Sequence, residues 1–140
     1  MTMNGSRTAM EAMTKKLNGP LVSVVDDDPS VRRSTERLLR CSGLCAEVFA
    51  SAEEFLASGR AEETACLILD QRLPGMSGLE LQQHLAAAAM PVPIVFLSAH
   101  SSDAEARQAL QAGALQFLQK PVSKEVLLVA IYHAIKSKTD

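Results

Sequence analysis

Five polar residues of this chain each follow a short, mainly apolar run, and their types are those that handle phosphoryl groups. They are Asp26, Asp27, Asp70, Ser98 and Lys120. If the runs are parallel strands, their carboxyl ends share one edge of a sheet, so the five side chains converge on one crevice. Carboxylates, a hydroxyl and an ammonium in one crevice suit a divalent cation and a phosphoryl group.

Asp70 is the candidate nucleophile of this set. A carboxylate can attack a phosphoryl group directly and form an aspartyl phosphate. The three equatorial oxygens of the transferring group each need a positive or hydrogen-bond-donating partner. A divalent cation, the Lys120 ammonium, and the Ser98 hydroxyl with neighbouring backbone N–H groups meet that requirement.

The aspartates also predict a metal site. Asp26, Asp27 and Asp70 brought together would repel one another, and one pKa would rise unless a cation intervened. Mg²⁺ uses one or two carboxylates, waters and phosphate oxygens, which fits this set. Asp28 is interpreted differently, because it precedes Pro29 and is predicted to be the N-cap of a helix.

The elements that must position these residues are predicted by hydrophobic patterning. Five apolar runs alternate with five helical patterns, which indicates βαβ units and a parallel sheet of the α/β class. The predicted strands are Leu21–Val25, Cys45–Phe49, Ala65–Leu69, Pro93–Leu97 and Leu115–Leu118. The first, third and fourth are almost wholly apolar, as is typical of strands covered on both faces.

Helix boundaries are predicted by capping residues. The predicted starts are Asp28 before Pro29 and three capping boxes, Ser51 with Glu54, Ser77 with Glu80 and Ser102 with Glu105. Gly43 and Gly113 stand where the first and fourth helices should end. The last helix is expected from about Ser123 to Ile135.

Composition narrows the kind of protein. With 140 residues, 47% hydrophobic and 21% charged, the chain predicts one globular domain with its own core. A formal net charge of −2 gives no basic field for nucleic acids or anionic membranes. No apolar run approaches the ~20 residues of a membrane span, and no secretory signal is visible, so a cytoplasmic protein is expected.

The cysteines do not indicate a disulfide framework or a zinc site. Cys41, Cys45 and Cys66 are odd in number and lack C-x-x-C spacing. Cys66 lies inside an apolar run, so it is predicted to pack as a small core residue.

Four segments of the chain resemble the receiver domain of two-component response regulators. They are 24–29 (Val-Val-Asp-Asp-Asp-Pro), 69–78 (Leu-Asp-Gln-Arg-Leu-Pro-Gly-Met-Ser-Gly), 97–99 (Leu-Ser-Ala) and 113–121 (Gly-Ala-Leu-Gln-Phe-Leu-Gln-Lys-Pro). The sequences of segment 51–56 and of the residues around Asp70 are most similar to those of FixJ-type transcriptional regulators. The resemblance implies a flavodoxin-like (CheY-like) fold of three layers, a doubly wound (βα)5 with parallel sheet order 2-1-3-4-5.

The resemblance implies a role for each reactive residue. Asp70 would accept phosphate from a phosphohistidine on a sensor histidine kinase. Asp27 and Asp70, with the backbone carbonyl of Arg72, would bind Mg²⁺ directly, and Asp26 would act mainly through water. Ser98 would be the switch hydroxyl that moves toward the phosphate.

Further roles implied by the resemblance concern the surroundings of the phosphoryl group. Phe117 would be the aromatic residue whose rotamer follows Ser98, and the Lys120–Pro121 bond would be cis. Three residues, Arg72, Ala99 and His100, would flank the phosphoryl group and tune its hydrolysis. These positions are otherwise interpreted as ordinary loop residues, and Phe117 as a half-buried strand residue.

Two other functional classes compete with a phosphoacceptor domain. An aspartate-nucleophile phosphatase shares the Asp, Ser and Lys inventory but needs an acid two positions after the nucleophile, where Arg72 stands. A phosphorylation-independent pseudo-receiver, used as an interaction module, should lack Asp70, Asp27 or Lys120, and none is missing. We therefore expect a signalling domain that catalyses its own phosphorylation and dephosphorylation but is not a metabolic enzyme.

Partners follow from the same interpretation. Phosphorylation is expected to favour a homodimer through the fourth helix, fifth strand and fifth helix, with Phe117 at the centre. The arginines of the first helix are interpreted as a solvated face or, by resemblance, a docking site for the kinase. Direct nucleic-acid binding and membrane binding are not expected.

The expected organisation has three parts. Residues 1–19 form a flexible tail in which a short helix at Thr8–Leu17 is allowed, 20–137 form the receiver, and 138–140 are a tail or the start of a linker. FixJ-type regulators usually carry a helix-turn-helix domain after the receiver. The sequence leaves open whether this receiver stands alone or precedes such a domain, and does not identify its kinase or stimulus.

Overall fold

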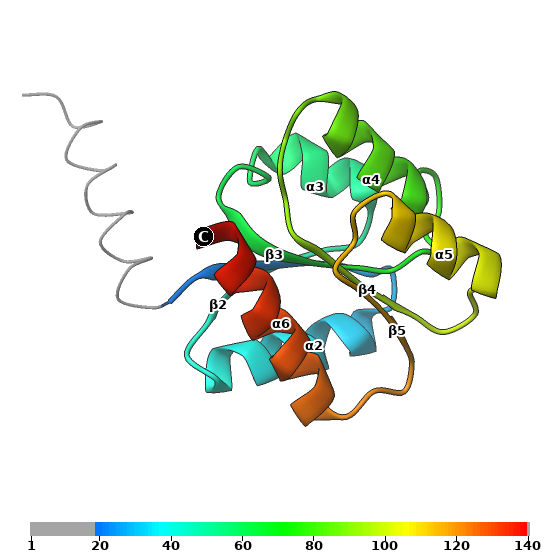
Figure 1. Ribbon diagram of the computed structural model, residues 1–140. Coiled ribbons are helices and arrows are strands. Elements are labelled where there is room, and N and C mark those ends of the chain that lie inside the picture. Colours follow the sequence, from blue (N-terminus) through cyan, green and yellow to red (C-terminus); the bar gives the residue numbers. More distant parts are fainter. Residues whose placement is uncertain (1–18, 140) are drawn as a thin grey trace, which may run out of the picture.

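Strands and helices alternate along the part of the chain that the structure describes, residues 19–139 of a computed structural model (Figure 1). Most of the expected N-terminal tail, with its allowed helix at Thr8–Leu17, lies outside these residues. The elements are β1 Leu21–Val25, α2 Pro29–Cys41, β2 Cys45–Phe49, α3 Ala52–Ser58, β3 Thr64–Leu69, α4 Gly78–Ala87, β4 Ile94–Ser98, α5 Asp103–Gln111, β5 Gln116–Gln119 and α6 Lys124–Thr139.

The five strands form one parallel sheet in the order β2-β1-β3-β4-β5. Helices α2 and α6 cover one face, and α3, α4 and α5 cover the other (Figure 1). This three-layer arrangement confirms the predicted doubly wound fold. Crossover helices on both faces bury almost every residue of the central strands, which explains their apolar sequences.

Two hydrophobic cores lie on the two faces of the sheet. Successive side chains of a strand point to opposite faces, so Val24 joins the core under α2 and α6 while Val25 joins the other. Leu39 and Ile131 are wholly buried in the first core, and Phe96 in the second. Cys66 is also wholly buried, as predicted, and burial raises the pKa of its thiol to about 12.

The capping residues begin the helices largely as predicted. Ser77 and Ser102 form reciprocal capping boxes with the glutamates three residues later. The box at Ser51 is only half formed, because Glu54 reaches one residue further back and accepts from the Ala50 N–H. Helices α2 and α5 end two residues before Gly43 and Gly113, which both have positive φ.

The last helix is longer than predicted and continues to Thr139. The Lys138 ammonium holds its final turn against the start of β3 by donating to the carbonyls of Glu62 (2.9 Å) and Thr64 (2.6 Å). Among residues 19–139, no helix is long and apolar enough to cross a membrane.

Candidate functional site

The sheet ladder continues one residue past its strands and fixes the backbone of the reactive residues. The N–H of Asp26 donates to the Phe49 carbonyl at 3.1 Å, and that of Asp70 to the Val25 carbonyl at 3.0 Å. The N–H of Lys120 donates to the Ser98 carbonyl at 2.9 Å. The carboxyl edge of the sheet therefore places the predicted residues side by side, each on a rigid strand end.

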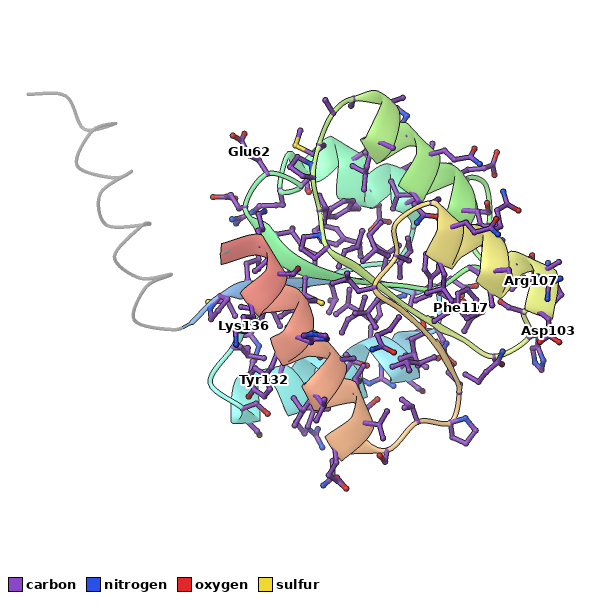
Figure 2. All side chains as sticks on the ribbon, viewed as in Figure 1. Glu62, Asp103, Arg107, Phe117, Tyr132 and Lys136 are labelled. Atoms are coloured by element: carbon purple, nitrogen blue, oxygen red, sulfur yellow. The ribbon has the colours of Figure 1, made fainter. Side chains whose placement is uncertain are left out.

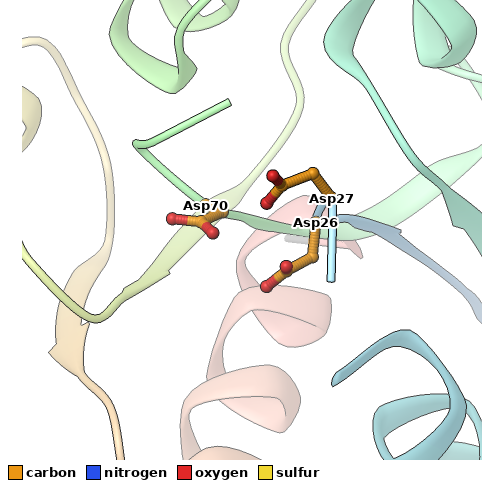
Figure 3. Close-up of side chains that lie close together, drawn as sticks. All are labelled: Asp26, Asp27 and Asp70. Atoms are coloured by element: carbon orange, nitrogen blue, oxygen red, sulfur yellow. The ribbon is translucent and has the colours of Figure 1, made fainter. Parts of the chain in front are cut away.

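Asp26, Asp27 and Asp70 form an acidic cluster at this edge (Figure 3). One carboxylate oxygen from each lies within 4.8 Å of those of the other two. Asp26 and Asp70 are buried, at 3% and 6% exposure, whereas Asp27 is open to solvent. Three hard oxygen donors at this spacing, one of them accessible, have the chemistry of a Mg²⁺ site.

Lys120 is the cation that this cluster already holds. Its Nζ donates to Asp26 Oδ2 at 2.8 Å and to Asp70 Oδ2 at 3.4 Å. Burial alone would lower the pKa of Lys120, but the hydrogen bond to Asp26 and the charge of Asp70 together raise it, so the ammonium is charged. One ammonium against three carboxylates leaves two negative charges, which a divalent cation would neutralise.

The two oxygens of Asp70 have different surroundings. Oδ1 accepts from the Ser98 hydroxyl and from the Arg72 N–H, both at 3.1 Å, while Oδ2 faces Lys120. Burial is the main reason that the pKa of Asp70 is raised, with a contribution from Asp26, against the lowering effects of Lys120, Arg72 and Ser98. The folded protein therefore holds this carboxylate at an electrostatic cost.

Ser98 is wholly buried and belongs to a short hydroxyl chain. Its Oγ, the donor to Asp70, accepts in turn from the Ser101 hydroxyl at 2.7 Å. The sequence gives no indication of this role for Ser101, because a serine in a loop carries no signal of such a contact. Phe117, on the neighbouring strand β5, stacks on the buried Phe96 with ring centroids 5.2 Å apart.

The loop after β3 is tied to the start of α5. The Arg72 guanidinium donates from Nη2 to Glu105 Oε1 at 3.0 Å and from Nε to the His100 carbonyl at 3.1 Å. Gln71 Nε2 donates to Glu105 Oε2 at 3.2 Å. The sequence indicated Glu105 only as a helix cap, so its contacts with Arg72 and Gln71 are additional findings.

The start of α4 packs closely against the backbone of Asp70. A Cβ on Gly78 would lie 2.5 Å from the Asp70 carbonyl oxygen and 2.9 Å from the Phe96 ring. Only glycine fits there without displacing the residue that carries the candidate nucleophile. The Gln71 side-chain carbonyl accepts from the Leu79 N–H at 2.7 Å and fixes the same approach.

The remaining predicted site residues lie in the loops that follow β4 and β5. Ala99 and His100 are exposed in the loop after β4, and the Lys120–Pro121 bond is cis. Beside Lys120, a groove of about 440 Å³ runs between α2 and the loop from β5 to α6, with apolar residues such as Val31, Leu38 and Val122 in its lining.

Comparison with known proteins shows the family. Residues 22–132 match the response regulator receiver domain. The chain is 43% identical over 124 residues to nodulation protein W of Bradyrhizobium diazoefficiens, covering 89% of this chain and 53% of that protein. It is 36% identical over 110 residues to the transcriptional regulatory protein FixJ of Azorhizobium caulinodans, covering 79% of this chain and 52% of that protein.

The solved structures that resemble this chain include response regulators, as the sequence relatives do. Response regulator StyR is 46% identical with a TM-score of 0.79, over 84% of this chain and 60% of that one. FixJ-N is 33% identical with a TM-score of 0.76, over 84% of this chain and 94% of that one. The chain spans about half the length of the curated relatives it matches. It belongs to the family of response regulator receiver domains of two-component systems.

Proposed function

We propose that Asp70 accepts a phosphoryl group from a phosphohistidine of a sensor histidine kinase. An oxygen of the Asp70 carboxylate attacks phosphorus, the phosphorus–nitrogen bond breaks, and its electron pair returns to the imidazole ring of the kinase. The observation that carries the proposal is that Lys120 lies 3.4 Å and Ser98 3.1 Å from this one carboxylate. Both can donate to oxygens of a phosphoryl group attached there.

The acidic cluster would hold the Mg²⁺ that this reaction needs. Asp27, Asp70 and the backbone carbonyl of Arg72 are the proposed direct ligands, with Asp26 acting mainly through water. The two uncompensated negative charges and the all-oxygen donor set support this assignment. When bound, Mg²⁺ supplies positive charge to the phosphoryl oxygens.

Hydrolysis of the aspartyl phosphate is proposed to be self-catalysed. Arg72, two residues after Asp70, and the exposed Ala99 and His100, which follow Ser98, would control how water reaches the phosphorus. The chain would thus act as a signalling switch in the cytoplasm, without turning over a separate metabolite. The retention of Asp27, Asp70 and Lys120 favours this function over the alternative of a phosphorylation-independent pseudo-receiver.

The kinase is proposed to dock over the groove beside Lys120. The groove is open next to the site, and its lining from α2 and the β5–α6 loop is largely apolar. Arg33 and Arg37 are exposed on α2 and could contact an acidic partner. Arg32 has a local role instead, since its Nη1 donates to the Asp26 carbonyl at 2.7 Å.

Phosphorylation is proposed to favour a homodimer through α5, β5 and α6. Ser98 would turn toward the phosphoryl group and Phe117 would follow it. The exposed large hydrophobic residues of the described chain all lie in this part of the molecule: Leu110, Leu115, Val126, Val129 and Tyr132. Tyr132 lies on α6, with Asp103 and Arg107 on α5 (Figure 2). Exposed apolar residues on elements that also carry charged residues are typical of a protein interface.

The output is proposed to be transcriptional, through a protein region or partner that binds DNA in place of this chain. The matched relatives include transcriptional regulators of which the matching segment covers only about half. No direct nucleic-acid binding or membrane binding is proposed for residues 19–139.

Intact-protein mass spectrometry tests the phosphoacceptor role. Incubation with acetyl phosphate and Mg²⁺ should add one phosphoryl group to the wild-type chain and none to Asp70→Asn. Asp28→Asn is the matched control, since it removes a neighbouring charge while asparagine can still cap α2. No mass gain in the wild type, or labelling of Asp70→Asn, would overturn the proposal.

Sedimentation velocity tests the dimer. Beryllofluoride with Mg²⁺ should raise the sedimentation coefficient of the wild-type chain but not that of Asp70→Asn. An unchanged coefficient in the wild type, with beryllofluoride binding demonstrated, would rule out dimerisation by this route.

A further inference from the structure

Glu105 has more partners than a helix cap requires. As in other capping boxes, it accepts from the Ser102 N–H, at 2.9 Å through Oε1. The same oxygen accepts from Arg72 Nη2 at 3.0 Å, and Oε2 accepts from Gln71 Nε2 at 3.2 Å. Glu105 therefore binds the side chains of both residues that follow Asp70.

Glu80 shows what a capping glutamate does without such partners. It occupies the equivalent position of α4, where its Oε1 accepts from the Ser77 N–H at 2.9 Å and its N–H donates to Ser77 Oγ at 3.2 Å. Among residues 19–139, the Glu80 side chain makes no hydrogen bond or ion pair to a residue other than its N-cap partner Ser77. The extra contacts of Glu105 are thus a property of its place in the fold.

The contacts direct the Arg72 guanidinium toward α5. Its backbone N–H donates to Asp70 Oδ1 at 3.1 Å, so the residue lies next to the candidate nucleophile. Its guanidinium, however, binds Glu105 and the His100 carbonyl. The charged groups that act on the Asp70 carboxylate are Lys120 and Asp26.

We propose that Glu105 is a positioning residue, which retains Arg72 at the start of α5 until a phosphoryl group on Asp70 competes for it. The inference rests on the proposed phosphorylation of Asp70 and adds a means of regulating that site. A phosphoryl group brings close to two negative charges, against one on Glu105. Arginine binds phosphate oxygens through paired N–H donors.

The contact is suited to exchange because it is weak. The Arg72 side chain is 59% exposed, and exposed ion pairs contribute little to folding stability. Its loss would loosen the first turn of α5, which would then keep only the hydrogen bond from Gln71 Nε2 to Glu105 Oε2 as its link to the loop after β3. Since α5 forms part of the proposed dimer face, the exchange of partners links the phosphoryl group to that face.

The test measures beryllofluoride affinity in the presence of Mg²⁺ by titration calorimetry. Glu105→Gln keeps a residue that can complete a capping box but removes the competing charge. We expect it to tighten binding by about twofold to fivefold, the range given by exposed ion pairs. Glu80→Gln is the matched control and should leave the affinity unchanged.

A double-mutant cycle separates positioning from a merely structural role. If Glu105 acts through Arg72, Glu105→Gln has no effect on affinity when Arg72→Gln is already present. The same effect in both backgrounds, or equal effects of Glu105→Gln and Glu80→Gln, would overturn the inference. The ¹⁵N chemical shift of Arg72 Nε in the ligand-free protein should move in Glu105→Gln and stay constant in Glu80→Gln.

Failure of this inference is distinct from failure of the proposed function. A wild-type chain that neither binds beryllofluoride nor gains a phosphoryl group would remove the proposed function. A wild-type chain that does both, with an affinity insensitive to Glu105, would remove only the role of Glu105.

Discussion

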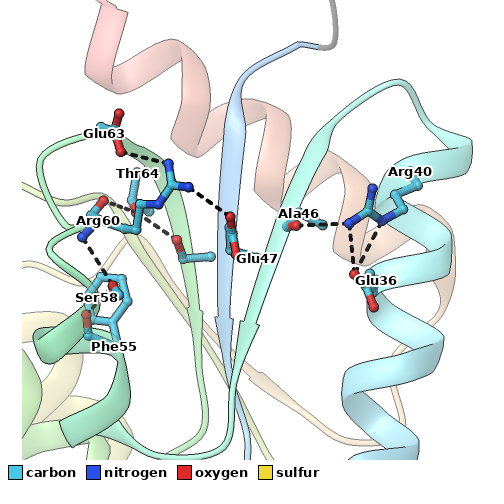
Figure 4. A network of polar contacts seen from close by, with 10 residues as sticks. Glu36, Arg40, Ala46, Glu47, Phe55, Ser58, Arg60, Glu63 and Thr64 are labelled. Atoms are coloured by element: carbon cyan, nitrogen blue, oxygen red, sulfur yellow. Dashed lines mark hydrogen bonds and ion pairs between the residues drawn. The ribbon is translucent and has the colours of Figure 1, made fainter. Parts of the chain in front are cut away.

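The carboxyl and amino edges of the sheet differ in how their charged side chains are balanced. At the carboxyl edge, one ammonium faces three carboxylates. At the amino edge, Arg60 pairs with Glu47 at 3.2 Å and with Glu63 at 3.0 Å (Figure 4). The first edge has an excess of negative charge, which the proposed Mg²⁺ would neutralise, whereas at the second edge the arginine is bound by carboxylates of the chain itself.

Buried polar groups sharpen this contrast. Ser23 and Thr64 are wholly buried beside the amino edge and bond to each other at 2.7 Å, and Thr64 also donates to the Arg60 carbonyl. The buried carboxylates Asp26 and Asp70, by comparison, share Lys120. The amino edge thus has its polar groups paired within the chain, while the carboxyl edge retains buried carboxylates at an electrostatic cost.

Removing a lysine should slow phosphorylation of Asp70 at the carboxyl edge but not at the amino edge. Lys120→Met should slow phosphorylation of Asp70 by acetyl phosphate by about a hundredfold or more, the usual effect of losing one donor to a developing charge. Lys138→Met removes the lysine bound to two carbonyls at the amino edge and should leave that rate unchanged. The rates are measured by following the intact mass of each protein over time. Similar rates for the two variants would contradict the claim that only the lysine at the carboxyl edge acts in phosphorylation.

Mg²⁺ should stabilise the protein only through the carboxyl edge. Saturation at a hundred times the Kd contributes about 2.7 kcal/mol to the free energy of unfolding, visible as a rise in Tm of several degrees. Asp27→Asn should reduce the rise, while Glu47→Gln should retain it. An equal rise in all three proteins would indicate non-specific ion binding.

Without Mg²⁺, neutralising Asp70 should stabilise the fold. Asp70→Asn removes a buried charge that Asp26 repels, and we expect the free energy of unfolding to rise by about 1 kcal/mol, the common scale of single substitutions. The raised pKa of Asp70 means that the folded state binds its proton more tightly than the unfolded state. The cost of ionisation is therefore present at neutral pH and disappears as pH falls toward the ordinary value of 3.8.

Urea unfolding at pH 7 and near pH 4 checks this prediction, because the difference between Asp70→Asn and wild type should shrink at the lower pH. A constant difference would assign the effect to packing. A wild-type protein more stable than the variant at pH 7 would contradict the electrostatic account.

The smallest effect is expected at the amino edge. Arg60→Gln breaks two half-exposed ion pairs and should cost about 0.2–1 kcal/mol, decreasing with added salt. Its Mg²⁺-induced rise in Tm should equal that of the wild type. A loss of that rise would show that the two edges are coupled.

The sequence allowed prediction of the residues placed by strand ends. Asp26, Asp70 and Lys120 each follow a strand, and the shared edge of a parallel sheet is enough to bring them together. Strand limits were accurate to within one residue, because alternation with capped helices leaves little freedom. The two helices with complete capping boxes begin as predicted for the same reason.

Contacts between the loop after β3 and its neighbouring elements could not be predicted in this way. Glu105 is 33 residues from Arg72 in the sequence, and their contact depends on how closely α5 approaches the loop after β3. Its capping box with Ser102 already accounted for its presence, so no signal of a second role remained. Likewise, the requirement for Gly78 depends on a backbone approach that no local pattern encodes.

The placement of Tyr132 gives the molecule an optical reporter. The chain has one tyrosine and no tryptophan, so its near-ultraviolet emission arises almost entirely from this ring. The ring is 47% exposed on α6, one of the three elements through which two copies are proposed to meet. Quenching of its fluorescence by acrylamide would therefore follow self-association without any attached dye.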